Sequence, residues 1–291
     1  MVTKRCVVPE EYNYLAAFLT LRCNLGCSYC INGKSGGVLR HREELTSEQW
    51  IDGLNGLELK PDLPVTLEGG EPTMHPGFYD IANGVRHPID ILTNLQFDIS
   101  EFTKRISPEK LNKRGIVGYK SIRASFHSEK MDAEDTIARA KELQDAGFAV
   151  GLFSLNIPES TEENMRMAEL ARQNRIYFFI KDFLGFRDGR LFGHFKYPEG
   201  LDGKRKSCGC RITDLLIAPD AEIYKCHRDM YHAEFPLGRL IDEELAIEHR
   251  FRQCDNYGTC NPCDLKLKTN RYLQMGSCSV EITPRKKKQK S

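Results

Sequence analysis

Three cysteines near the start of the chain have a spacing that suits an iron–sulfur cluster. Cys23, Cys27 and Cys30 form a C-x3-C-x2-C motif, in which Gly26 would permit a tight loop. Thiolates at short spacings bind iron–sulfur clusters, and three of them can hold three corners of a 4Fe-4S cluster. No fourth cysteine lies nearby in the sequence. The iron without a protein ligand could then coordinate a substrate or a cofactor, as the open position of a catalytic zinc site does.

A structural zinc site, completed by His41 or by a distant cysteine, is the alternative interpretation of this motif. Zinc motifs more often consist of paired C-x2-C units than of a C-x3-C-x2-C triplet. The spacing therefore favours the iron–sulfur cluster.

A second group of cysteines follows a long stretch that has none. Its members surround a predicted β-hairpin, whose turn is at residues 219–222. Taken alone, their spacings suit tetrahedral zinc and an iron–sulfur cluster equally well. In order, they are Cys208 and Cys210 before the hairpin, Cys226 after it, Cys254, the C-x2-C pair Cys260 and Cys263, and Cys278.

Between the two cysteine groups, short apolar runs alternate with helical patterns, which is typical of βα units around a parallel sheet. Capping boxes at Thr46 and Ser160 and an amphipathic segment at residues 131–146 predict helices. Six such repeats are fewer than the eight of a complete barrel, so we predict an α/β fold with a partial (βα)6 TIM-like barrel. The predicted strands are residues 15–21, 64–68, 89–93, 121–126, 149–155 and 176–181.

The stretch at residues 193–207, rich in Gly, Lys and Pro, predicts the boundary to a small cysteine-rich C-terminal domain. We therefore expect the barrel over residues 1–192 and the C-terminal domain over residues 193–282. Residues 283–291 are predicted to form a basic disordered tail.

Composition and charge disfavour several classes of protein. With 42 Lys and Arg residues against 41 Asp and Glu, the chain has no net charge that would favour nucleic acid or an anionic membrane. No run approaches the ~20 apolar residues of a membrane span, and no secretory signal is visible, so we expect a cytoplasmic protein without a membrane partner. Eleven cysteines in such a chain favour metal or redox roles over structural disulfides.

The cysteine triplet resembles the hallmark of the radical S-adenosylmethionine (SAM) superfamily, which has this spacing and an aromatic residue before the last cysteine, as Tyr29 is here. Residues 69–72 read Gly-Gly-Glu-Pro and match the superfamily's GGE(P) motif. The resemblance covers about residues 15–185. It implies a 4Fe-4S cluster at which SAM is cleaved to methionine and a 5′-deoxyadenosyl radical, which abstracts a hydrogen atom from the substrate. It also implies an external one-electron donor such as flavodoxin or ferredoxin.

The resemblance further assigns positions that bind SAM. The methionyl amino group would bind at the GGE(P) motif, whose glycines would let the backbone approach a ligand closely. Polar residues at the ends of later strands would line SAM and the substrate, although each could equally be a loop hydrogen bond or a helix cap. The assigned residues are Tyr29, Gly69, Gly70, Glu71, Pro72, Asn94, Ser125, His127 and Asn156.

The C-terminal region resembles the Twitch domain, a shortened form of the SPASM extension of radical SAM enzymes, which carries an auxiliary 4Fe-4S cluster. Ala221 occupies the turn position where that family usually has glycine. A zinc ribbon, or a second auxiliary cluster held by Cys210, Cys254 and Cys278, stays an alternative. The resemblance implies that the ligands of one auxiliary cluster are Cys208 or Cys210, together with Cys226, Cys260 and Cys263.

An auxiliary cluster with four protein ligands has no open iron, so we expect it to transfer electrons. Accepting an electron from a substrate radical would make the net reaction a two-electron oxidation. The barrel begins too early for a separate peptide-binding domain, so we expect the substrate to be a small molecule. Redox-neutral epimerisation and modification of a ribosomal peptide are the alternatives, and a non-catalytic zinc protein that binds nucleic acid is a remote one. Near the sixth strand, Lys181, Asp182 and Arg187 could bind or deprotonate a substrate hydroxyl, or form only a surface salt bridge.

Overall fold

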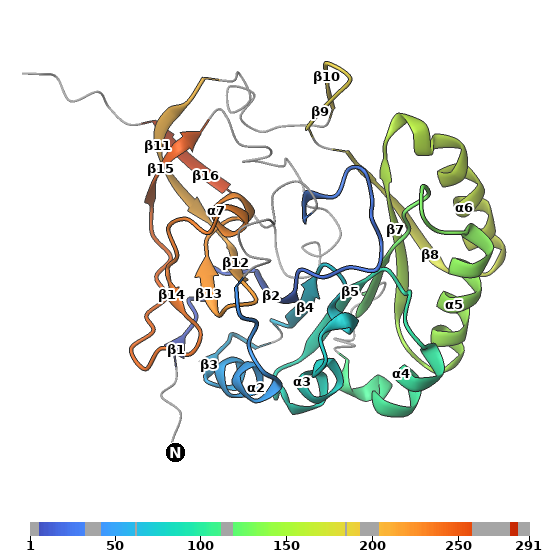
Figure 1. The fold of residues 1–291 in the computed structure, drawn as a ribbon, viewed down its shortest axis with the longest axis horizontal. Helices are drawn as coiled ribbons and strands as arrows, with labels where there is room; N and C mark the ends of the chain where they lie inside the picture. Colours follow the sequence, from blue (N-terminus) through green and yellow to red (C-terminus); the bar gives the residue numbers. More distant parts are fainter. Residues whose placement is uncertain are drawn as a thin grey trace, which may run out of the picture.

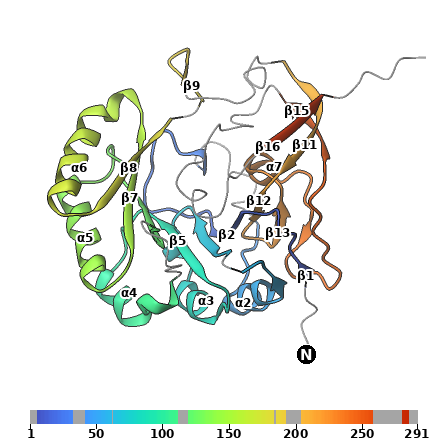
Figure 2. The same cartoon turned by 180° about the vertical axis from the view of Figure 1, so that it is seen from behind.

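The computed structural model describes residues 6–32, 42–61, 63–111, 119–183, 185–192, 204–257 and 280–284. Within these ranges, strands and helices alternate along the first two thirds of the chain. The strands form a curved sheet with helices on its outer face (Figures 1 and 2). None of the helices described is long and apolar enough to cross a membrane.

Nine of the described strands form one sheet, in the order β14-β13-β12-β2-β4-β5-β6-β7-β8. The six strands from β2 to β8 run parallel and in chain order, as the strands of a partial barrel do. Each predicted strand is present to within one residue at either end, and the predicted α/β fold is confirmed. The six strands are β2 (Tyr14–Thr20), β4 (Val65–Gly69), β5 (Ile89–Thr93), β6 (Ile122–Ser125), β7 (Val150–Asn156) and β8 (Tyr177–Asp182).

The helices of the βα units begin largely where the sequence predicts. The capping box at Thr46 is confirmed, since its hydroxyl accepts the Gln49 N–H at 3.3 Å and its own N–H donates to Gln49 Oε1 at 2.9 Å. The capping box at Ser160 is wrong, because that hydroxyl donates to the carbonyl oxygens of Leu155 and Ile157. The helices are α2 (Ser47–Asn55), α3 (Phe78–Gly84), α4 (Ile99–Arg105), α5 (Ala133–Asp145) and α6 (Thr161–Gln173).

Short elements complete the barrel region. β1 and β3 pair in parallel, and β9 and β10 form an antiparallel hairpin after β8. The three 3-10 helices within the described ranges each begin with proline, whose fixed φ and missing N–H suit a first turn. These elements are β1 (Cys6–Val7), β3 (Leu57–Glu58), η2 (Pro72–Met74), η3 (Pro108–Lys110), η4 (Pro158–Ser160), β9 (Gly185–Arg187) and β10 (Arg190–Phe192).

The predicted C-terminal hairpin is present, and it continues the barrel sheet. Its first strand, β12, lies parallel to β2, with Asp214 opposite Tyr14 and Ile217 opposite Ala17. β13 and β14 extend the sheet further, whereas β11, β15 and β16 form a separate three-stranded sheet. The elements are β11 (Lys206–Ile212), β12 (Asp214–Ile217), β13 (Glu222–Tyr224), α7 (His227–His232), β14 (Gly238–Arg239), β15 (Arg252–Tyr257) and β16 (Val280–Pro284).

The predicted tail begins too early in the sequence. Thr283 and Pro284 belong to β16, where they lie opposite Gly209 and Cys208 of β11. Pairing with a neighbouring strand therefore extends the ordered chain past residue 282. Residues 285–291 and most of the predicted boundary at 193–207 lie outside the described residues.

Successive strand residues face opposite sides of the sheet and so build two hydrophobic clusters. One cluster lies between the sheet and the helices. The other faces the barrel interior and includes Tyr14, Ala16 and Phe18 of β2 together with Leu216 of β12 and Tyr231 of α7. The C-terminal region thus supplies part of the wall of the barrel interior.

A buried ion pair lies near the N-terminal ends of the central strands. The Arg123 guanidinium donates to Asp90 Oδ1 at 3.0 Å, and the Tyr119 hydroxyl donates to Asp90 Oδ2 at 2.6 Å. Both charged side chains are at most 3% exposed. A buried carboxylate with these two donors is satisfied, so this pair belongs to the framework beneath the site.

Candidate active site

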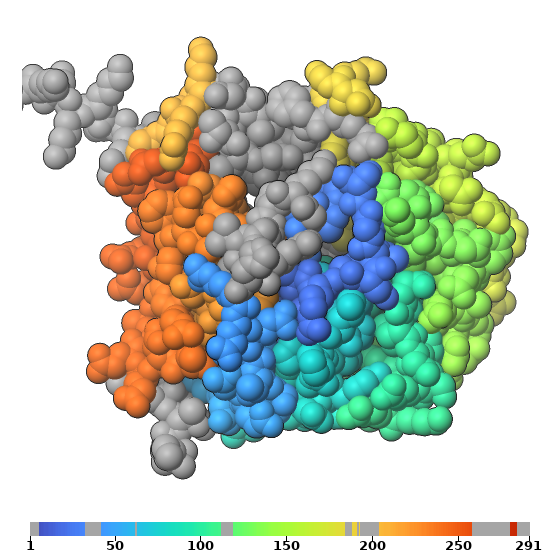
Figure 3. Space-filling view, in the orientation of Figure 1, coloured from blue at the N-terminus to red at the C-terminus, as the bar shows by residue number. Residues whose placement is uncertain are grey.

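The loop with the three cysteines leaves β2 at the C-terminal end of the parallel sheet. Cys23, Cys27 and Cys30 all line one cavity of about 660 Å³, together with Met74 of η2 and Pro219 of the C-terminal hairpin. Figure 3 shows the N-terminal segment, in blue, at the surface between the barrel, in green, and the C-terminal region, in orange. The barrel loops and the hairpin therefore both line the cavity that contains the three thiols.

The glycines after β4 hold this loop against the sheet. The Gly70 N–H donates to the Thr20 carbonyl and the Glu71 N–H to the Arg22 carbonyl, both at 2.8 Å. A Cβ on Gly69 would lie 2.1 Å from the Thr20 oxygen, and one on Gly70 would lie 2.2 Å from the Arg22 oxygen. The close approach that requires glycine is thus an approach to the backbone at the end of β2, whereas the sequence predicts an approach to a ligand.

Gly70→Ala should therefore disturb the cysteine loop, whereas Gly26→Ala should not. A Cβ at Gly26 would meet nothing within 4 Å, and Gly26 is not among the glycines with positive φ, so the loop conformation does not require glycine at this position. Overpacking at Gly70 should lower the free energy of unfolding by about 1–3 kcal/mol and reduce the iron bound after reconstitution. Thermal unfolding and iron assays of both variants test this. Equal effects of the two substitutions would contradict it.

Hydrogen bonds from β5 and β6 fix the same loop from two further sides. Asn94, after β5, donates to Asn24 Oδ1 at 2.8 Å, and Asn24 donates to the Gln96 carbonyl at 2.9 Å. After β6, the Tyr29 hydroxyl lies 2.8 Å from His127 Nδ1. The predicted residues Tyr29, Asn94 and His127 are thus brought together at the cysteine loop.

Glu129 adds another contact from the loop after β6, because its carboxylate accepts the Ser28 N–H. The sequence analysis did not select Asn24, Ser28 or Glu129. Because Asn24 and Ser28 lie inside the cysteine motif, the sequence could have indicated them. No sequence pattern indicates Glu129.

Glu71 is a buried link between β4 and β5. Its carboxylate accepts the Thr73 N–H and hydroxyl, the Thr93 hydroxyl and the Asn94 N–H. Burial raises the pKa of Glu71, and these hydrogen bonds oppose that shift. With no exposed surface, Glu71 acts here by positioning Asn94, and Pro72 continues the same turn as the first residue of η2.

The environment of the thiols fits a cluster whose cysteines bind different irons. Burial first, and then the nearby Cys30 and Glu129, raise the pKa of Cys27 to about 11, and burial also raises the pKa of Cys23. Cys23 and Cys27 thus keep their protons at neutral pH until a metal replaces them. No three His, Cys, Asp or Glu side chains in the described ranges surround a point that one ion could occupy. A 4Fe-4S cluster needs no such point, since its ligands bind separate irons.

The remaining predicted SAM-binding residues lie at the C-terminal ends of their strands. Ser125 ends β6 and is half-buried, whereas Asn156 ends β7 and is exposed, opposite Asp182 of β8. Burial lowers the pKa of His127 to about 4, so its ring is neutral at physiological pH. A neutral imidazole can exchange a hydrogen bond with the Tyr29 hydroxyl in either direction.

The three predicted catalytic residues do not come together. Lys181 and Asp182 are adjacent on β8, so their side chains leave opposite faces of the sheet. The Lys181 ammonium lies over the Phe153 ring, 4.7 Å from its centre, and Asp182 is exposed. Arg187 is in β9, and its side chain lies outside the described part of the chain. Only Lys181 is placed toward the barrel interior.

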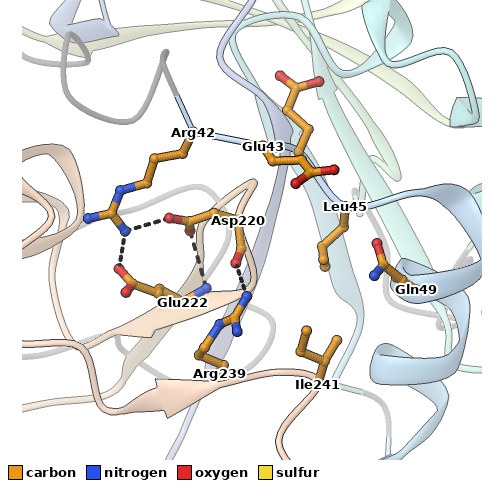
Figure 4. Close-up of a pocket in the computed structure, with 9 residues that line it drawn as sticks. Arg42, Glu43, Leu45, Gln49, Asp220, Glu222, Arg239 and Ile241 are labelled. Carbon is orange, nitrogen blue, oxygen red and sulfur yellow. Dashed lines mark hydrogen bonds and ion pairs between the residues drawn. The ribbon is translucent and has the colours of Figure 1, made fainter.

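A second cavity, of about 440 Å³, marks a junction between the cysteine loop and the C-terminal hairpin (Figure 4). Arg42 donates to Asp220 at 2.6 Å and to Glu222 at 2.7 Å, and these carboxylates raise its pKa. The Leu45 N–H donates to the Pro219 carbonyl at 2.8 Å. The chain that leaves the cysteine loop is therefore fastened to the hairpin that leads to the second cysteine group.

Four cysteines of the second group approach one another in the structure. Cys208 and Cys210 lie two residues apart on β11 and are buried, and Cys208 lies opposite Cys254 of β15. A hydrogen bond between Cys210 and Cys254 raises the pKa of the first thiol and lowers that of the second. Cys226 follows β13 and caps α7, where its sulfur accepts the Asp229 N–H.

The strand register thus brings in Cys254, which the sequence analysis gave only to an alternative second cluster. The predicted ligands Cys260 and Cys263, and Cys278, lie outside the described residues. Ala221, where the Twitch pattern has glycine, adopts φ of +76°, so the hairpin keeps the left-handed turn without glycine.

The chain is similar in sequence to known proteins over most of its length. The sequence profile of the Radical SAM superfamily matches residues 18–171. The PqqA peptide cyclase of Ruegeria pomeroyi is 24% identical over 311 aligned residues, which cover 88% of this chain and 80% of that protein. The mycofactocin maturase MftC of Mycobacterium tuberculosis is 28% identical over 120 residues, or 41% of this chain and 28% of that protein.

Two solved structures have a similar fold. The anSMEcpe structure with bound AdoMet and Kp18Cys peptide superposes with a TM-score of 0.54 and 12% identity, covering 79% of this chain and 78% of that one. Streptococcus suis SuiB bound to the precursor peptide SuiA gives a TM-score of 0.53 and 14% identity, covering 84% and 64%. At these identities the likeness concerns the fold alone.

Proposed function

Because the chain belongs to the radical SAM superfamily, we propose that it uses SAM and a 4Fe-4S cluster to modify a peptide. The observation that carries the proposal is the gathering of Cys23, Cys27 and Cys30 in one cavity at the C-terminal end of the sheet. When bound there, the cluster would supply the electron that cleaves SAM to methionine and a 5′-deoxyadenosyl radical. The protein itself must hold the cysteine loop rigid and keep the substrate close to that loop.

The residues around the loop suit that positioning role. Gly70 and Glu71 fasten the start of the loop by backbone hydrogen bonds, and Asn94 fastens Asn24 within it. The neutral His127 ring keeps the Tyr29 side chain directed toward β6. A loop held from β4, β5 and β6 has few ways to move, which would keep its three thiols at one fixed spacing.

The relatives favour a peptide substrate over the small molecule expected from the sequence. Proteins named as a PqqA peptide cyclase and a mycofactocin maturase are similar in sequence, and the solved structures of similar fold contain peptides. The expectation of a small molecule depended on the early start of the barrel. The cavity that the barrel loops and the C-terminal hairpin both line supports a peptide substrate instead.

For the C-terminal region we propose an auxiliary iron–sulfur cluster that accepts an electron from the substrate radical. In support, Cys208, Cys210, Cys226 and Cys254 lie close enough to influence one another's pKa. Cys208 and Cys210 share one face of β11, and Cys254 lies opposite Cys208 on the neighbouring strand. Cys254 is therefore a further ligand candidate, in addition to Cys260 and Cys263. A net two-electron oxidation would balance if the auxiliary cluster passed this electron on to the SAM-binding cluster, with SAM as the oxidant. An external donor such as flavodoxin or ferredoxin would then be needed only for the first turnover.

The experiment that tests this function is a substrate screen with 5′-deoxyadenosine as the readout. Reconstituted protein with SAM and dithionite should form 5′-deoxyadenosine slowly, and a pool of synthetic peptides should accelerate its formation. Mass spectrometry of the accepted peptide should show loss of two hydrogen atoms for an oxidation and an unchanged mass for an epimerisation. Acceleration by sugars, cyclitols or free amino acids, with no response to peptides, would contradict the proposal.

A further inference from the structure

The Lys181 side chain is a cation inside the barrel for which the described part of the chain supplies no ion-pair partner. It occupies the position before the end of β8, in register with Leu155 of β7. Its ammonium lies over the Phe153 ring at 4.7 Å. With the residues that the structure describes, Lys181 makes no hydrogen bond and no ion pair. This sets it apart from Arg123, a buried cation that is paired with Asp90.

The charges around Lys181 do not neutralise it. Arg123 of β6 repels it, whereas Glu68 of β4 attracts it. The Glu68 carboxylate already accepts the Tyr14 hydroxyl at 2.5 Å. Burial and the charge of Lys181 lower the pKa of His127, whose ring is neutral. Removal from water, followed by Arg123, lowers the pKa of Lys181 to about 8, so the ammonium is still charged at pH 7.

A cation held away from water is costly unless an anion or several acceptors satisfy it. The aromatic ring of Phe153 offsets part of this cost, since the negative face of the ring attracts the cation. All three donor positions of the ammonium are left for a ligand. An anion brought into the barrel would therefore gain a charge-assisted ion pair with the half-buried ammonium.

We propose that Lys181 binds a carboxylate of the peptide substrate inside the barrel, so that the reacting residue is held beneath the cysteine loop. This inference rests on the proposed peptide-modifying function. A carboxylate is preferred over a neutral acceptor because it would complete the missing ion pair. The cysteine loop is fastened at β4, β5 and β6, whereas Lys181 lies on β8, which favours the substrate over SAM as the source of the carboxylate.

Acetylation of Lys181 provides a test that does not depend on turnover. Lysine reacts only as the free amine, and a paired carboxylate should raise the pKa of Lys181 by about one unit or more, as opposite charges do at close range. At pH 7 this lowers the reactive fraction about tenfold. The probes are Ac-Ala-Glu-Ala-NH2, its neutral partner Ac-Ala-Gln-Ala-NH2, Ac-Ala-Ala-Ala-OH and SAM, with mass spectrometry to follow Lys181 and the exposed Lys104 of α4 as an internal control.

We expect the peptide with glutamate, or the one with a free C-terminal carboxylate, to slow acetylation of Lys181 about tenfold. The two acidic probes thereby tell a side-chain carboxylate from a terminal one. Equal protection by the glutamine peptide, no protection by either acidic probe, or protection by SAM alone would overturn the proposal. None of these outcomes affects the formation of 5′-deoxyadenosine, so failure here is distinct from failure of the proposed function.

Two variants separate the charge of Lys181 from its packing. Lys181→Arg keeps a cation that can bind a carboxylate, and Lys181→Met keeps much of the length without charge. In calorimetric titrations, the acidic peptide that protects Lys181 should bind more than about tenfold more weakly to Lys181→Met, while Lys181→Arg recovers part of the affinity. Identical affinities in all three proteins would show that the carboxylate binds elsewhere.

Discussion

Cys27→Ala is expected to abolish reductive cleavage of SAM. The substitution removes one of three thiols that line the cavity at the end of β2, and two cysteines cannot hold a cluster that otherwise has three protein ligands. With SAM and dithionite, 5′-deoxyadenosine should fall to the level formed without enzyme. Liquid chromatography of the reaction mixture measures this product directly.

Cys6→Ala is the matched control for that variant. Cys6 is also half-buried, and burial raises its pKa too, but it lies on the short strand β1, apart from both cysteine groups. It should retain the cluster and its SAM cleavage. If Cys27→Ala still formed 5′-deoxyadenosine at the rate of Cys6→Ala, the assignment of this loop to a SAM-cleaving cluster would be untenable.

Cys226→Ala should separate SAM cleavage from peptide modification. If the C-terminal cysteines hold an auxiliary cluster, iron should fall from about eight to about four atoms per chain, with the remaining four at the barrel loop. The variant should still form 5′-deoxyadenosine but should lose the oxidised peptide, because the substrate radical would have no electron acceptor. Iron and sulfide assays, combined with mass spectrometry of the peptide, measure both effects.

Cys254→Ala refines the same prediction. Cys254 lies opposite Cys208 and hydrogen-bonds to Cys210. If Cys254 is a ligand, the Cys254→Ala protein should therefore lose as much iron as the Cys226→Ala protein. Unchanged iron in both variants would remove the auxiliary cluster from the mechanism. A zinc signal in place of the missing iron would identify a structural site instead.

The barrel was predictable because most of its strands, unlike β8, are buried on both faces. Runs such as residues 15–21 and 149–155 are almost continuously apolar, and helical patterns separate them. The attachment of β12 to β2 was not predictable, because the pairing joins segments about 200 residues apart in sequence and depends on the open edge of the barrel. The tail boundary at residue 283 failed for a similar reason, since pairing with β11 orders Thr283.

In the site, the sequence located the cysteines but not what holds them. The motif at residues 69–72 was found, yet its glycines accommodate the backbone of Thr20 and Arg22, which no local pattern reveals. The contact between Asn24 and Asn94 likewise joins residues that are 70 apart in the chain. That the described residues leave Lys181 without an ion-pair partner could be recognised only once the charges of β4 and β6 were placed around it.

The most direct test of SAM chemistry at the cysteine loop is the EPR spectrum of the reduced, reconstituted protein, recorded with and without SAM. If Cys23, Cys27 and Cys30 hold a 4Fe-4S cluster with one open iron, SAM should change the g-values of its signal. The variant lacking all three cysteines should show neither that signal nor any response to SAM. A reduced wild-type signal that is identical with and without SAM would contradict an open iron at this loop.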